Sequence, residues 1–117
     1  MSIDLQKLRA LEMPSKKIFA EVLGEKQEIT IQAYGYDISL KINDMRVNFP
    51  EDGEYRIWVM LLTECAGLSV EDAELYIQKD GNGAANVIRE INALCREYDA
   101  QCSKLRKDAK KKYETAN

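Results

Sequence analysis

The most constraining feature of the sequence is a long helical pattern over residues 83–113. Its apolar residues recur at alternating spacings of three and four, which places them on one stripe of an α-helix. Val87 and Leu94 widen this stripe in its first half only. The pattern therefore predicts a helix whose first half packs into a globular core, while its second half keeps a narrow seam suited to a partner helix. The stripe consists of Ile88, Ile91, Cys95, Tyr98, Cys102, Leu105 and Ala109.

The narrow second half of the stripe is the candidate partner-binding site. Cys102 and Ala109 are small side chains, which allow a second helix to approach closely. Two interpretations remain open: the helix packs along its whole length on its own domain, or its second half docks a helix from a second copy or a different protein. The candidate residues are Tyr98, Cys102, Lys104, Leu105, Arg106 and Lys107.

Charge is distributed unevenly along the chain. Residues 1–99 contain 11 Lys/Arg and 18 Asp/Glu, a net charge of −7, whereas residues 100–117 contain 6 and 2, a net charge of +4. A basic end on an acidic body is either a solvated helix terminus or a contact for an acidic partner.

The residue chemistry argues against an enzyme. The chain has no histidine, which removes Ser-His and Cys-His nucleophile pairs and the commonest metal ligand. Cys65, Cys95 and Cys102 lack CxxC spacing, so we expect no metal, no cofactor and reduced thiols. The first residues lack the pattern of a secretory signal, and no apolar run approaches the ~20 residues of a membrane span. We therefore expect a cytoplasmic protein.

The N-terminal part changes its hydrophobic period. Residues 3–12 predict a short amphipathic helix, which Pro14 ends. Residues 17–23 are then rich in apolar side chains, and residues 29–33 and 36–42 alternate between apolar and polar side chains, with turn residues between the runs. This period of two predicts three strands, at 17–23, 29–33 and 36–42, joined as an antiparallel β-meander.

The remaining residues, 50–113, predict three helices. Pro50 opens the first, whose residues 57–62 are apolar on all sides and should be deeply buried. Gly67 ends that helix and Ser69 caps the next one, over 70–79. Asn82 is expected to cap the long last helix. The sequence thus predicts a single α+β domain over 1–117: a small N-terminal antiparallel meander followed by three helices, the last one long with a basic end.

Two local patterns have functional alternatives. Gly81-Asn82-Gly83 precedes a helix, but it follows another helix and lacks the remaining residues of a nucleotide-binding loop, so we interpret it as a turn. The link Ala66-Gly67-Leu68-Ser69 resembles the turn of a helix-turn-helix protein. The helix that would read DNA begins with Glu71, Asp72 and Glu74, which opposes contact with phosphates. An αα-hairpin is therefore the favoured interpretation.

The order of these elements resembles the tail assembly chaperones of long, flexible-tailed phages and related prophages. The resemblance covers Tyr55 to Tyr98: an apolar helix (Tyr55-Arg56-Ile57-Trp58-Val59-Met60-Leu61-Leu62), a turn and acidic helix (Ala66-Gly67-Leu68-Ser69-Val70-Glu71-Asp72-Ala73), and a long charged helix. A short β portion before these helices is compatible with the family. The lysine-rich end of this chain also suits the translational frameshift that the family uses near the stop codon.

The resemblance implies a protein that is not an enzyme. It would bind the tape measure protein, keep that long helical protein soluble, and assist assembly of the tail tube protein. It would leave before the tail is finished, and several copies would coat one tape measure molecule, with weak self-association. A DNA-binding regulator and a structural tail or head-joining protein are the alternatives. Salt-dependent duplex binding would indicate the former, and presence in purified particles the latter.

Overall fold

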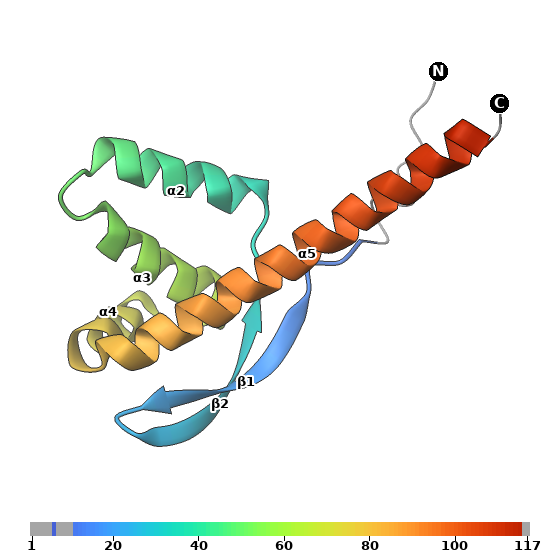
Figure 1. The fold of residues 1–117 in the computed structure, drawn as a ribbon. Helices are drawn as coiled ribbons and strands as arrows, with labels where there is room; N and C mark the ends of the chain where they lie inside the picture. The colour runs from blue at the N-terminus through green and yellow to red at the C-terminus, as the bar shows by residue number, and fades with distance from the viewer. Residues whose placement is uncertain (1–5, 7–10, 116–117) are drawn as a thin grey trace.

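The computed structural model describes residue 6 and residues 11–115 of the chain. Its elements are β1 (Ser15–Val22), β2 (Glu25–Gln32), α2 (Tyr36–Asn48), α3 (Gly53–Ala66), α4 (Val70–Lys79) and α5 (Gly81–Thr115). A two-stranded antiparallel sheet is followed by helices, the last one long, which confirms the α+β class (Figure 1). The short helix predicted over 3–12 falls outside the described residues, apart from positions 6, 11 and 12.

The first two predicted strands form a hairpin. Val22 of β1 pairs with Glu25 of β2, so Leu23 and Gly24 make a two-residue turn. Both turn residues have positive φ, 53° and 85°, as tight hairpin turns require. Because leucine rarely adopts this conformation, an additional contact is needed. The Leu23 N–H donates a hydrogen bond of 2.8 Å to Oδ2 of Asp80, which fixes the turn against the start of α5.

The predicted third strand at 36–42 is wrong, because these residues begin the helix α2. Alternation of Tyr36, Ile38, Leu40 and Ile42 suggested a strand, yet only Ile38 and Ile42 are buried. These two are four residues apart, and Met45 continues the same helical face against the core. Tyr36, at 79% exposure, points to solvent. The sheet is therefore a hairpin rather than a meander, and four helices follow it rather than three.

The helical link predicted around Gly67 and Ser69 is confirmed. Helix α3 ends at Gly67, which adopts the left-handed conformation with φ of 74°. Ser69 then caps α4, because its Oγ accepts a hydrogen bond of 3.1 Å from the Asp72 N–H. Helix α3 begins at Gly53 rather than Pro50. A Cβ on Gly53 would lie 2.8 Å from the carbonyl oxygen of Met45, so glycine permits the close approach of α2 and α3.

The core lies between the hairpin and the helices α3 and α5. Its largest fully buried side chains come from all three: Ile31 of β2, Leu62 of α3, and Val87 and Ile91 of α5. Seven residues of α3 are buried, as the apolar composition of that helix predicts. Asp80, and not Asn82, caps α5, since its Oδ1 accepts a hydrogen bond of 3.1 Å from the Gly83 N–H.

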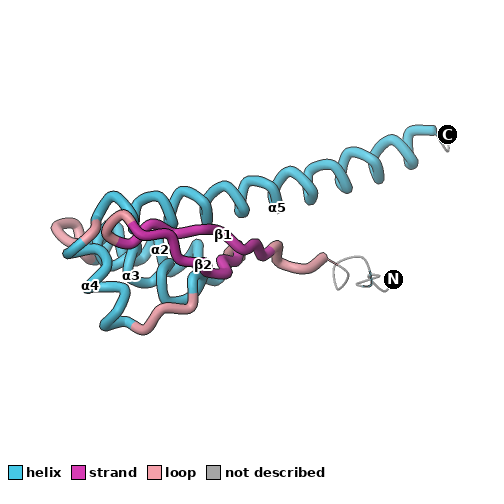
Figure 2. The backbone as a smooth tube through the Cα atoms, turned by 90° about the horizontal axis from the view of Figure 1, so that it is seen from below, coloured by secondary structure: helices cyan, strands magenta, loops and turns pink. Residues whose placement is uncertain are grey.

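Helix α5 is much longer than the body that it covers. Its 35 residues span about 52 Å at the usual rise of an α-helix. The first half packs on α3, α4 and the hairpin, whereas the last turns extend past these elements (Figures 1 and 2). Among the described residues, no helix is both long and apolar enough to cross a membrane.

Candidate functional site

The apolar stripe of α5 divides into a buried and an exposed part. Ile88, Ile91 and Leu94 are buried in the core. Tyr98 and Cys102 are only partly covered, and Leu105 is 46% exposed. We call Tyr98, Cys102, Leu105 and Ala109 the distal seam. The structure therefore places an apolar seam on the part of α5 that leaves the body.

The N-terminal part of the distal seam, Tyr98 and Cys102, borders a shallow groove of about 510 Å³. Tyr98, Cys102 and Arg106 line one side. Tyr34, from the link between β2 and α2, and Tyr36, the first residue of α2, belong to the other. Three of the six residues predicted to bind a partner thus share one surface. This surface could receive an apolar side chain of a helix that lies along α5.

The other three predicted residues do not share this groove. Leu105 lies one turn further along the same face of α5. Helical geometry of about 100° per residue places Lys107 on the face opposite Tyr98, and Lys104 near that face. Lys104, Arg106 and Lys107 are exposed, and the ion pairs identified within the described residues do not include them. Among these cations, Arg106 is therefore the one beside the seam.

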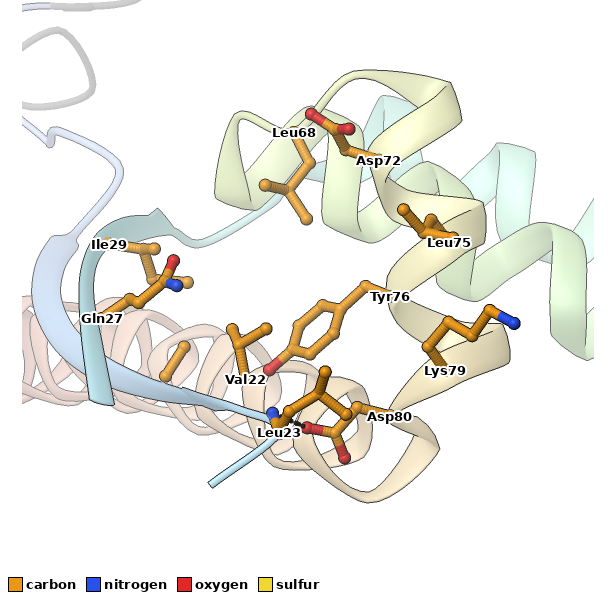
Figure 3. Close-up of a pocket in the computed structure, with 11 residues that line it drawn as sticks. Val22, Leu23, Gln27, Ile29, Leu68, Asp72, Leu75, Tyr76, Lys79 and Asp80 are labelled. Carbon is orange, nitrogen blue, oxygen red and sulfur yellow. Dashed lines mark hydrogen bonds between the residues drawn. The ribbon is translucent and has the colours of Figure 1, made fainter. Parts of the chain in front are cut away.

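A second surface was not predicted from the sequence. An apolar groove of about 350 Å³ lies between the hairpin and α4, and we call it the hairpin groove. Figure 3 shows Val22, Leu23 and Ile29 of the hairpin on one side of it, with Leu68, Leu75 and Tyr76 on the other. The lining is completed by Ala20, Gln27, Asp72, Lys79 and Asp80.

Two hydrogen bonds join the hairpin to α4 and to Asp80, the residue that follows α4. The Tyr76 hydroxyl donates a hydrogen bond of 2.6 Å to the carbonyl oxygen of Glu21. Desolvation, with smaller effects of Asp80 and Glu21, raises the pKa of Tyr76, so its hydroxyl keeps the proton that it donates. Asp80 binds the hairpin turn through Leu23. These residues are 55 and 57 positions apart in sequence, which is why no local pattern revealed the groove.

The cysteines do not form a reactive centre. Cys65 is 4% exposed, and burial raises its pKa to about 12. Burial also raises the pKa of Cys95, although a hydrogen bond of 3.4 Å from the Tyr34 N–H to its sulfur opposes the shift. Because the thiolate is the nucleophile, both groups are inert near neutral pH. Within the described residues, no three acidic, cysteine or histidine side chains are grouped as metal ligands.

The α3–α4 link has the turn of a helix-turn-helix but not its electrostatics. Glu71 and Asp72 are exposed on the first turn of α4, the helix that would enter a DNA groove. Their carboxylates would repel phosphates. The first basic residue of α4 is Lys79, at its last position. These charges oppose the docking of α4 against a phosphate backbone.

Comparison of the chain with known protein families, curated proteins and solved structures finds no match. The two apolar surfaces, the distal seam and the hairpin groove, are thus the features on which a functional argument rests.

Proposed function

We propose that this protein is a phage tail assembly chaperone that binds the tape measure protein through the distal seam of α5, keeps it soluble and assists assembly of the tail tube. The observation that carries the proposal is Leu105. This leucine is 46% exposed on a helix that extends beyond its own core. An exposed apolar seam of this kind suits capture of an amphipathic helix.

Two further features support binding of a long helical partner. The groove beside Tyr98 and Cys102 offers space for side chains along one face of α5. Exposed cations beyond residue 103 would attract acidic segments and speed the encounter. Neither feature requires catalysis. The order of elements from Tyr55 to Tyr98 resembles that of the tail assembly chaperones, and this resemblance is the reason for proposing the tape measure protein as the partner.

The test is co-expression with the product of the longest neighbouring open reading frame, which the proposal expects to be the tape measure protein. We expect the tape measure protein to become soluble and to co-purify with several copies of the chaperone. Leu105→Glu should abolish both effects while the variant itself stays folded. Val47→Glu is the matched control, because Val47 is 77% exposed on α2, away from α5.

Four results would overturn the proposal. The first is a tape measure protein that neither binds nor gains solubility. The second is normal binding by the Leu105→Glu variant. The third is salt-dependent binding of the purified chain to duplex DNA, which would indicate a regulator instead. Finding the chain as a permanent component of finished particles would indicate a structural protein.

A further inference from the structure

The hairpin groove and the distal seam lie at opposite ends of α5. Asp80, which lines the groove, directly precedes the first residue of the helix. Leu105 is 24 residues beyond Gly81, about 36 Å along a continuous helix. The seam of one molecule therefore cannot bend back to its own groove. Any contact between these two surfaces must join two molecules.

The groove has the features of a receptor for an amphipathic helix. Leu75 is 52% exposed on its α4 side and Leu23 is 73% exposed on its hairpin side. Its lining is mostly apolar, and the polar groups are restricted to a few residues, including Asp72, Asp80 and Lys79. A single leucine with small neighbours would fit between the two walls without a large rearrangement.

The distal seam supplies that shape. Leu105 stands between the small residues Cys102 and Ala109 on one helical face. Arg106 flanks the seam on one side and Asp108 on the other, so the seam offers a partner of opposite sign both to the carboxylates and to the lysine of the groove's lining.

The overall charge favours the same pairing. Residues 1–99, which build the groove, carry a net charge of −7, and residues 100–117 carry +4. The basic end of one molecule is therefore attracted to the acidic body of another. Two α5 ends placed side by side would instead bring two basic segments together.

We propose that the hairpin groove of one molecule binds the distal seam of a second molecule of the same chain. The contact is head to tail, because groove and seam are different surfaces. The first molecule then keeps a free seam and the second a free groove, so association continues into open chains or closes into rings. One helical segment in one groove buries less than a standard interface, and the association is accordingly weak and concentration-dependent.

This inference does not rest on the proposed function, since it concerns the purified chain alone. It does connect with that function, because both contacts use Leu105. Binding of a partner helix and self-association would exclude each other, and a partner would dissolve the self-assembled form.

Sedimentation velocity of the purified full chain over a wide range of concentration tests the proposal. We expect species that grow with concentration and shrink as ionic strength rises, because salt screens the attraction between the acidic body and the basic end. Leu75→Lys in the groove and Leu105→Gln in the seam should each weaken association about tenfold or more. Glutamine is used so that no new ion pair can form with the lysine introduced in the groove.

An equal mixture of the two variants is the decisive experiment. The intact groove of Leu105→Gln can still bind the intact seam of Leu75→Lys, whereas every other combination is damaged. The mixture should therefore form dimers that grow no further. Val47→Lys is the control and should associate like the wild type. Circular dichroism should show that all variants are folded.

Several outcomes would overturn the proposal. A chain that is monomeric at every concentration would mean that the groove serves another ligand. Dimers that the Leu105→Gln variant loses but Leu75→Lys keeps would indicate pairing of two α5 helices. A variant mixture that stays monomeric would equally refute the head-to-tail contact.

Discussion

The two halves of α5 have the same apolar spacing and opposite environments. Ile91 is completely buried, whereas Leu105, fourteen residues later on the same stripe, is 46% exposed. The difference lies in the width of the stripe. Val87 and Leu94 give the first half a broad apolar face that several elements can cover, and the second half lacks such neighbours. Spacing therefore predicts the helix, and width predicts which part of it belongs to the core.

The strongest test of this difference between the two halves of α5 is to place an aspartate in each of them. Ile91→Asp should unfold the domain, because an unpaired carboxylate in the core destabilises it by about 4 kcal/mol or more. Leu105→Asp should change the free energy of unfolding by less than about 0.5 kcal/mol. Urea unfolding followed by circular dichroism measures both. Equal effects would show that the distal seam is also core.

A second prediction, with a smaller expected effect, concerns Asp80 at the start of α5. Its two carboxylate oxygens accept hydrogen bonds from the Leu23 and Gly83 N–H groups. Asp80→Ala should destabilise the domain by about 2 kcal/mol, because both donors lose their partner. Asn82→Ala is the control and should have little effect. A larger loss for Asn82→Ala would restore Asn82 as the cap.

The dependence of stability on pH tests the burial of one core thiol, that of Cys65 in α3. The pKa of Cys65 is about 12 in the folded protein against 9.0 for the ordinary thiol. Above pH 9 the unfolded chain releases this proton while the folded protein retains it, so stability falls from pH 9 towards pH 12. Between pH 9 and 10 the loss is about 1 kcal/mol. Unfolding of Cys65→Ala in parallel should show a shallower dependence; identical slopes would contradict the burial of this thiol.

The smallest expected effect comes from removing the distal part of α5. A chain that ends after Ser103 should unfold at nearly the same urea concentration as the full chain, within about 0.5 kcal/mol, because the described side chains that it loses are exposed. It should nevertheless lose partner binding and self-association. A large loss of stability would mean that the distal helix supports the body.

Much of the fold follows from local sequence. Gly67 and Ser69 mark a helix end and a cap that depend only on their own backbone conformation, and both were predicted. The alternation at 36–42 misled, because Ile38 and Ile42 satisfy a strand and a helix equally well until Met45 is included. Asn82 was a plausible cap, yet Asp80 can serve the helix and the hairpin turn at once.

The candidate surfaces were predicted unequally. The distal seam is a property of one helix and is visible in its spacing. The hairpin groove forms only when β1 and β2 meet α4, with Tyr76 bonded to Glu21. A contact between residues 55 positions apart has no signature in a local window, so sequence reasoning could not find it.

The hairpin also has a consequence for synthesis on the ribosome. Two strands alone are marginally stable in water, and the buried residue of β2, Ile31, packs in a core that includes Val87 and Ile91. The hydrogen bond of the hairpin turn, from the Leu23 N–H to Asp80, also cannot form until Asp80 has been synthesised. The two strands are synthesised first, and their apolar side chains therefore stay exposed to water until most of the chain has emerged. Folding of this domain is a late event of translation, and a ribosome paused before α5 would present an open pair of strands to the chaperones of the cell.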